Sequence, residues 1–252
     1  MTEQFYQNMA VPDACALGKR IYKKQFYENS QLNAADKKAF AEDIDAIEWR
    51  YTLKPETINI PRFEDSTHEY PEVAILQVRL KSGRRMARIA QVIQKAIPYP
   101  VLIIFVWEDQ IALNVAEKRI SRAHTNKIVV EAVHDTGWIS LGDPEPWQAD
   151  FLADFCVTRF SYRNFFAFYQ DMVKRIVALN CGRHTGCYSP EPVSGGSVAE
   201  RIHIFSQIEE LQQEEAAIRN KLKKEKNLGT QVQLNMQVKQ IKDRIEAMKT
   251  EL

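Results

Sequence analysis

The sequence predicts an α+β protein, with a mixed, mainly antiparallel sheet of about five strands and packed helices, plus a C-terminal antiparallel coiled-coil helical hairpin. Three observations lead to this fold class. Seven apolar residues run without interruption from Val101 to Trp107, which is typical of a strand covered on both faces. Segments with strand and helix periodicity alternate around it. After Ser197, apolar residues recur at alternating spacings of about four and three, the period of coiled-coil seams.

Composition places the chain among globular proteins with reduced thiols. Hydrophobic residues make up 45% of the 252 residues, and Lys+Arg 34 balance Asp+Glu 33. A nucleic-acid role therefore has to rest on a local basic patch. No run reaches the roughly 20 apolar residues of a membrane span, and the N-terminus lacks a signal-peptide pattern. With only four cysteines in a chain of this length, we expect a cytoplasmic protein that makes no membrane contact.

The first part of the chain gives mixed signals. Near the N-terminus, basic residues alternate with apolar and aromatic ones at Lys19, Arg20, Lys23 and Lys24. An aromatic-anchored segment lying on the core is the favoured interpretation, and a basic arm that contacts phosphate is the alternative. Asn33 is a good N-cap for a helix whose apolar stripe is Phe40, Ile44 and Ile47. The alternating residues 57–60 predict a short strand.

The middle of the chain supplies most of the predicted sheet. Residues 73–81 form a strand pattern, and a helical stripe follows from Met86 to Ile97. Pro98 and Pro100 end that helix, and the Val101–Trp107 strand comes next. A helix between two strands is typical of a crossover that places them parallel. Residues 111–116 indicate an antiparallel return, and residues 128–133 a further strand.

The sequence then divides into three regions. We expect residues 1–180 to form the α+β globular domain, ending in a helix from Tyr162 to Leu179. Residues 181–196, rich in Gly, Pro and Ser, are interpreted as a linker loop. Residues 197–252 form the hairpin, whose first helix starts with a capping box at Ser197 and Glu200.

The second hairpin helix carries the clearest seam. Its predicted partner-binding residues are Leu234, Val238, Ile241, Ile245 and Met248. The break at residues 227–229 favours a left-handed cap at Gly229, followed by a second capping box from Thr230. Glu215 lies on the seam of the first helix, where a carboxylate is costly unless it is paired. Such a hairpin could fold back on itself, form a homodimer or bind another protein.

A basic cluster is the strongest nucleic-acid candidate in the sequence. It spans a strand end, a turn and the first turn of a helix, and consists of Arg79, Lys81, Arg84, Arg85 and Arg88. Arginine forks and helix-end amides could hold phosphate there. The alternative is a solvated strand end whose charges protect the sheet edge.

Two metal hypotheses carry weaker signals. Cys181, His184 and Cys187 have the residue types of a zinc site, with Cys156 or His203 as an unplaced fourth ligand, but a second cysteine pair is missing. A metal-dependent nuclease would need clustered carboxylates and a lysine. The available residues are Glu56, Asp65, Glu69, Glu72 and Lys81. No acidic-x-Lys element occupies the strand at 73–81. We therefore expect no catalytic residues, no metal and no cofactor.

Several segments together resemble an uncharacterised bacterial family known as a numbered domain of unknown function. These segments are Lys23–Tyr27, Phe40–Trp49, Leu53–Ile60, Ile97–Pro100 and Lys223–Asn235. Members of that family tend to be encoded beside helicases and DNA methyltransferases in restriction-like antiphage loci. The resemblance implies a role in DNA-directed defence and supplies no catalytic residues.

The leading hypothesis is therefore a non-catalytic accessory subunit of a bacterial DNA-directed, helicase-associated defence system. Its expected partner is a helicase or DNA methyltransferase, and DNA is a further possible partner. The alternatives are a metal-dependent nuclease built around Glu72 and a DNA-binding module that uses the basic strand-turn-helix cluster.

Overall fold

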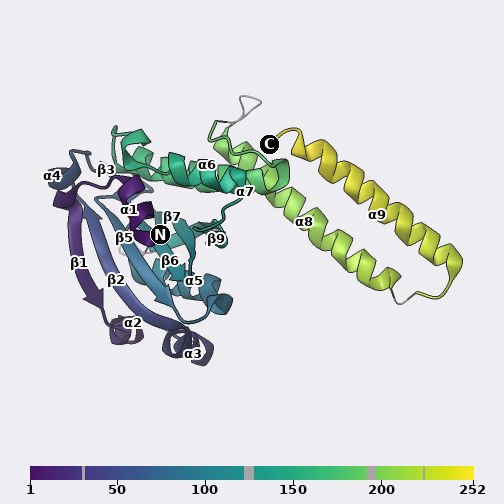
Figure 1. Cartoon of the computed structure of the whole chain (residues 1–252), viewed down its shortest axis with the longest axis horizontal. Helices are drawn as coiled ribbons and strands as arrows, with labels where there is room; N and C mark the ends of the chain where they lie inside the picture. Colours follow the sequence, from purple (N-terminus) through teal and green to yellow (C-terminus); the bar gives the residue numbers. More distant parts are fainter. Residues whose placement is uncertain (30–31, 122–127, 192–196, 224) are drawn as a thin grey trace. The chain divides into compact units, whose positions relative to one another are not determined.

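The computed structural model describes residues 1–29, 32–121, 128–191, 197–223 and 225–252 (Figure 1). The chain divides into two compact units, Met1–Ile176 and Val177–Leu252. The first unit is an α+β domain built on a mixed sheet, and the second is helical over its described residues.

The sheet of the first unit has seven strands within the described residues. Six of them follow the order β1-β2-β5-β6-β7-β8, and β9 pairs with β7. The strands are β1 (Ala16–Ile21), β2 (Ile44–Leu53), β5 (Val73–Leu80), β6 (Val101–Trp107), β7 (Gln110–Ile120), β8 (Ile128–Asp135) and β9 (Ile139–Ser140). Among the described strands of this sheet, only β5 and β6 pair in parallel, and the other neighbours are antiparallel. The predicted mixed, mainly antiparallel sheet is confirmed.

Strand β6 is buried on both faces, as its unbroken apolar sequence predicts. Residues Val101 to Phe105 are fully buried, and Val106 is nearly so. Helix α5 (Met86–Ala96) connects β5 to β6, which explains their parallel pairing because a crossover is needed to bring the chain back. The predicted antiparallel return is also confirmed, since β7 pairs with β6 through a tight turn.

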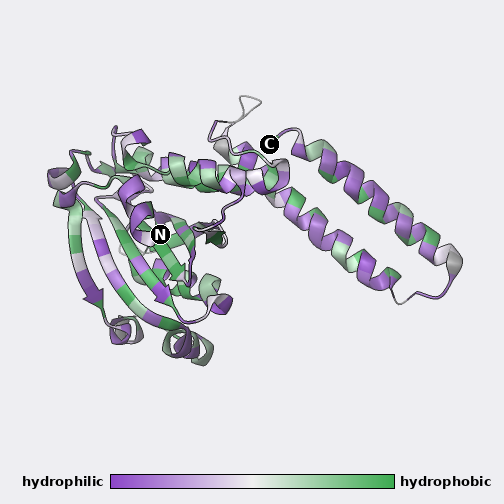
Figure 2. Cartoon of the chain, in the orientation of Figure 1, coloured by the Kyte–Doolittle hydropathy of each residue, from purple (hydrophilic) through white to green (hydrophobic). Residues whose placement is uncertain are grey.

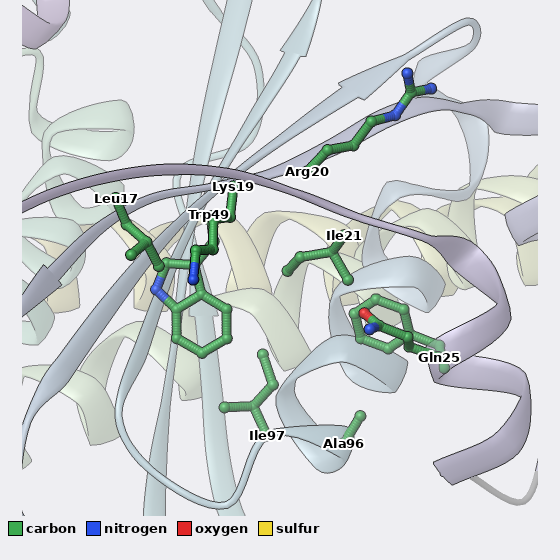
Figure 3. A pocket seen from close by; sticks show the side chains of 9 residues that line it. Leu17, Lys19, Arg20, Ile21, Gln25, Trp49, Ala96 and Ile97 are labelled. Carbon is green, nitrogen blue, oxygen red and sulfur yellow. The ribbon is translucent and has the colours of Figure 1, made fainter.

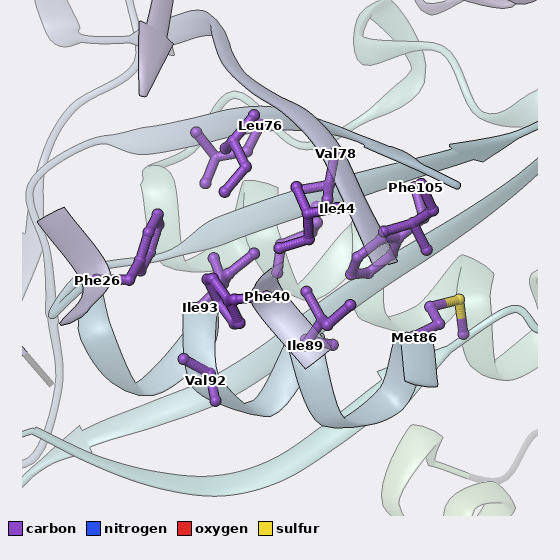
Figure 4. Close-up of a cluster of buried hydrophobic side chains, with 14 of the residues drawn as sticks. Phe26, Phe40, Ile44, Leu76, Val78, Met86, Ile89, Val92, Ile93 and Phe105 are labelled. Carbon is purple, nitrogen blue, oxygen red and sulfur yellow. The ribbon is translucent and has the colours of Figure 1, made fainter. Parts of the chain in front are cut away.

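One face of the sheet, here called the α5 face, packs against α2 (Lys23–Asn29), α3 (Ala34–Asp43) and α5. Figure 4 shows the cluster, in which Phe26 and Phe40 come from the short helices. Ile89 and Ile93 of α5 belong to the same buried cluster as Phe105 of β6. Burying side chains of this size stabilises the fold by about 1.5–3 kcal/mol each before the loss of conformational entropy is subtracted.

The opposite face is covered by α1 (Thr2–Met9) and by the first part of α7 (Phe165–Thr185). The Tyr6 hydroxyl of α1 donates to Gln77 Oε1 at 2.9 Å. The Tyr169 hydroxyl of α7 donates to the Val101 carbonyl at 2.9 Å and accepts from the Ala116 amide at 2.9 Å. Both tyrosines thus supply apolar rings and place their hydroxyl groups in hydrogen bonds with polar groups of the sheet.

In the first unit, the structure differs from the predicted end of the Asn33 helix and from the strand predicted at residues 57–60. The Asn33 N-cap is confirmed, but helix α3 ends at Asp43 and Ile44 already begins β2. Residues 57–60 were expected as a strand, whereas Pro55–Ile58 form the short helix α4 and Asn59 is left-handed with φ 56°. Pro55 is the first residue of this helix, because a proline at the first helical position already has the required φ.

The remaining elements of the first unit are short. They are the 3-10 turns η1 (Asp13–Cys15), η2 (Gly83–Arg85) and η3 (Val157–Arg159), the small hairpin of β3 (Phe63–Glu64) and β4 (Glu69–Tyr70), and helix α6 (Pro146–Asp154). In η2, Gly83 has a steric role, since an added Cβ would lie 2.8 Å from the Trp107 ring.

In the second unit, helices α8 (Val198–Leu222) and α9 (Leu228–Lys249) pack together (Figure 1). The predicted capping box is confirmed: Ser197 Oγ accepts from the Glu200 amide at 3.2 Å. Asn227 is the N-cap of α9, so Gly229 lies in the first turn of this helix and not in the expected left-handed cap. The N-cap is therefore Asn227 and not Thr230, from which the second capping box was expected. Helix α7 continues to Thr185, so residues 181–185 of the predicted linker loop are helical. Residues 192–196 of that linker lie outside the described residues.

The predicted seam matches the burial along both helices. Ile208, Leu211 and Ile218 of α8 are buried, as are Val238, Ile241 and Ile245 of α9. The other faces are mostly hydrophilic (Figure 2). The Glu215 carboxylate, expected to be costly on the seam, accepts from Arg219 Nε at 2.7 Å. One turn of helix separates the two residues, so the ion pair forms within α8.

We predict that Phe105→Ala lowers the free energy of unfolding by about 3–5 kcal/mol, because it opens a cavity between β6 and the helices of the α5 face. Val133→Ala is the control: Val133 is 39% exposed on β8, and its truncation should cost no more than about 0.5 kcal/mol. Urea denaturation followed by circular dichroism measures both. A similar loss for the two variants would contradict the assigned central role of β6.

Candidate functional site

The predicted basic cluster assembles around the end of β5, η2 and the start of α5, but carboxylates accompany it. The Arg85 guanidinium donates from Nε to Asp43 Oδ2 at 2.5 Å and from Nη2 to Asp43 Oδ1 at 2.7 Å. Nη2 also lies 2.7 Å from Glu42 Oε2. The hydrogen bonds that Arg85 donates to Asp43, and to a smaller extent the one to Glu42, raise the pKa of Arg85 above its ordinary value.

Two other arginines of the cluster are paired as well. Arg88 Nε lies 2.6 Å from Asp36 Oδ1, and Arg79 lies 3.8 Å from Asp45. Each pair reduces the positive potential that phosphate would meet. Lys81 and Arg84 form no ion pair with the residues that the structure describes. Phosphate binding by this cluster stays a prediction, and its arginines have a second role in holding α3 beside α5.

The carboxylates considered for a nuclease engage in separate local interactions. Glu72 lies 3.8 Å from Lys54 Nζ, and Glu56 lies 4.0 Å from Arg62. Asp65 accepts from the Thr67 and His68 amides at 2.7 Å each, and these hydrogen bonds, with Thr67 first, lower its pKa to about 2. The described residues include no group of three His, Cys, Asp or Glu side chains placed to hold a metal ion.

The residues considered for zinc differ in their surroundings. Cys181 is buried in α7, and burial raises the pKa of its thiol. His184 packs against Phe205 with ring centroids 5.6 Å apart, and burial lowers its pKa. Cys187 is exposed, and both Cys181 and Cys187 are free thiols. Cys156, considered as a fourth ligand, lies 3.0 Å from Thr158 Oγ1.

The predicted partner-binding residues of α9 have an internal role in the structure. Val238, Ile241 and Ile245 are buried in the seam with α8, and Leu234 and Met248 are half-buried there. A docking surface on the hairpin therefore has to use other residues. Among the α9 side chains whose burial the structure describes, the most exposed apolar ones are Val232 and Met236, each 59% exposed.

The structure reveals a buried lysine that the sequence pattern does not single out. Lys118 of β7 is 4% exposed, and its ammonium group donates to the carbonyls of Ile97 and Tyr99 at 2.9 and 2.8 Å. Burial lowers its pKa to about 7. These bonds tie the loop between α5 and β6 to the sheet. In the sequence, a lysine at this position of the strand looks the same as a lysine that faces solvent. The alternation of apolar and polar residues therefore does not show that Lys118 is buried.

The second unpredicted feature is a hollow on the α5 face at the β1–β2 edge of the sheet, here called the Trp49 pocket. Its volume is about 380 Å³, within the usual range of ligand pockets, about 300–1,000 Å³. It is lined by Leu17, Lys19, Arg20, Ile21, Gln25, Phe26, Trp49, Ala96 and Ile97 (Figure 3). Most of these side chains are apolar or aromatic, with cations at the rim, so the pocket fits an uncharged ring attached to an anionic group better than it fits a reaction centre.

We predict that Lys118 makes stability depend on pH in the alkaline range. Its folded pKa of about 7 lies below the ordinary value of 10.5, so between these values the unfolded chain binds more protons at this residue. The free energy of unfolding should therefore rise with pH there, by at most about 1.4 kcal/mol per pH unit. Between about pH 7.5 and 9, the wild type should gain about 1–2 kcal/mol relative to Lys118→Met, measured by urea denaturation.

Lys95→Met is the matched control, because Lys95 is exposed on α5. Its difference from the wild type should stay constant over the same pH range. If Lys118→Met also kept a constant difference, the buried ammonium would not be the cause of the alkaline gain.

Comparison with known proteins gives one match. No curated protein and no solved structure matches the chain.

Within the described residues, none of the helices combines the length and the apolar character that crossing a membrane requires. A family model described as "Domain of unknown function (DUF4391)" matches residues 9–245. This match covers both units almost completely, and the chain belongs to the DUF4391 family.

Proposed function

We propose that this protein is a non-catalytic accessory subunit of a bacterial DNA-directed antiphage defence assembly of the restriction-modification type. In this proposal the α8–α9 hairpin docks onto a helicase or DNA methyltransferase in the cytoplasm. The resemblance to a family encoded beside such enzymes supports the biological setting. The exposed apolar pair of α9 supports the docking role and is the observation that carries it.

The exposed pair lies on the side of α9 that faces away from α8. Val232 and Met236 each precede a seam residue, Leu234 and Val238, by two positions, which corresponds to about 200° around a helix. They are one turn apart and so form a single patch. Because the seam already provides the contact between α8 and α9, this patch adds nothing to the hairpin's own stability.

Its chemistry suits a protein contact. Polar side chains surround the patch, among them the exposed Gln233, Gln237 and Lys239. An apolar centre within a polar rim is the usual arrangement of protein interfaces, and the centre supplies most of the binding energy. Methionine also adapts its shape to a partner surface.

We predict that the double variant Val232→Glu, Met236→Glu loses its partner. In pull-downs of the tagged full-length chain from its native cells, recovery of helicase or DNA methyltransferase should fall by roughly ten-fold or more. The reason is that two carboxylates would be desolvated in the apolar centre of the interface. Mass spectrometry identifies and quantifies the recovered proteins.

The matched control is Gln233→Glu, Gln237→Glu, which adds the same charge on the adjacent side of α9. It should retain most of the partner. Circular dichroism checks that both variants keep their helices. Equal recovery with the wild type and the Val232, Met236 variant would reject docking through this patch. Light scattering shows whether the patch instead joins two copies of this chain, which would also contradict the proposal.

A further inference from the structure

The Trp49 pocket has a fixed aromatic wall. Trp49 Nε1 donates to the Tyr51 carbonyl at 3.1 Å, and the Tyr99 ring lies against the indole with centroids 6.2 Å apart. Trp49 is only half-buried, so part of the indole borders the hollow. A ring held on one side and open on the other is a stacking platform for a second flat ring.

Strand register decides which cations face this platform. Lys19 lies directly opposite Trp49 across the β1–β2 pair, so both side chains lie on the α5 face. Arg20, which also lines the hollow, lies opposite Glu48, and its guanidinium extends away from the Trp49 ring, as Figure 3 shows. The ammonium group of Lys19 is therefore at the rim beside the indole, and the Arg20 guanidinium is on the other side of the edge strand.

A second hollow continues the first along the chain. Its volume is about 300 Å³, and it shares Arg20 and Ile21 with the Trp49 pocket. Its wall includes Tyr22, which is 67% exposed, and also Lys23, Lys24 and the acidic Asp45. Two hollows in a row, each with an aromatic side chain and basic residues, make an extended surface from β1 to α2.

Among the residues that the structure describes, three of the five cations of the cluster on η2 and α5 are in ion pairs, namely Arg79, Arg85 and Arg88, and Lys81 and Arg84 are not. Lys19 and Arg20 are exposed, and within the described part of the chain neither forms an ion pair. In contrast, Arg85 and Arg88 are held by Asp43 and Asp36. An anion approaching β1 therefore meets cations whose charge is not already compensated.

We propose that the edge formed by β1 and the start of α2 binds single-stranded DNA, with one base in the Trp49 pocket and the adjoining phosphates at Lys19 and Arg20. Aromatic side chains along a basic groove are the general means of binding single strands, because every base offers a face for stacking. A base within a duplex is already stacked and cannot enter the pocket without being flipped out. The choice of DNA over RNA rests on the proposed function.

The test uses the full-length protein and a fluorescently labelled dT oligonucleotide of roughly 15 nucleotides. Fluorescence anisotropy should show binding that weakens as salt increases, since phosphate contacts release counterions. The variant Lys19→Glu, Arg20→Glu should weaken binding by roughly ten-fold or more. Both residues are exposed on an edge strand, so the fold should be kept, which circular dichroism verifies.

The matched control, Lys239→Glu, Lys242→Glu, makes the same change in net charge at exposed positions of α9. It should bind like the wild type. The oligonucleotide should also quench the tryptophan fluorescence of the wild type, and Trp49→Phe should remove most of this quenching while keeping an aromatic ring in the pocket.

Four results would overturn the assignment: normal binding by Lys19→Glu, Arg20→Glu, equal loss in the control variant, equal or tighter binding of a duplex of the same length, or tighter binding of an rU oligonucleotide. The proposal is separable from partner docking. If Lys19→Glu, Arg20→Glu binds DNA normally but the Val232, Met236 variant still loses its partner, only the DNA site fails. If DNA binding behaves as expected and partner recovery never depends on α9, only the docking proposal fails.

Discussion

Burial of the parallel β5–β6 pair from both sides is the constraint on which the first unit depends. The parallel pairing needs a crossover, and α5 supplies it on one face. The other face takes its cover from α1 and α7, and Tyr6 and Tyr169 join these helices to the sheet. A helix about 10 Å wide covers roughly two strands spaced about 4.8 Å apart. The cover on the α5 face therefore thins toward β1, where only the seven-residue α2 remains and Trp49 stays half-exposed.

Elements specified by local pattern could be predicted from the sequence, whereas the boundary at Ile44 could not. The unbroken apolar strand, the crossover helix and the four-three spacing of α8 and α9 were predicted correctly. Phe40, Ile44 and Ile47 have helical spacing, yet the last two belong to β2. A register shift between Ile44 and Ala46 places Ile44 and Ile47 in the same core cluster on the α5 face. A bulged strand therefore reproduced the spacing that helices show, and only its pairing with β5 distinguishes the two.

Long-range pairing also explains why the sequence did not reveal the surroundings of the candidate site residues. The arginines of η2 and α5 are close together in sequence, but Asp43 lies 42 residues before Arg85 and its proximity is set by tertiary structure. The same holds for the hairpin. A four-three stripe shows that a helix needs a partner, and it does not show whether the partner is in the same chain. In this structure α8 fulfils that need, so the seam residues of α9 are already in contact within the chain.

The Trp49 pocket combines residues from β1, α2, β2 and the end of α5, so no single motif of the sequence contains it. Protection of the sheet edge explains part of the exposed charge on β1. Lysine and arginine on an edge strand discourage pairing with other chains, and Lys19 and Arg20 would serve that purpose without any ligand. This protective role does not account for an indole fixed by Tyr51 and Tyr99 beside an open hollow. If the Trp49 ring only completed the core, covering it fully would make the fold more stable, since burial of apolar surface contributes about 25 cal/mol per Å². The exposed part of Trp49 is therefore the feature that a binding role explains and edge protection does not.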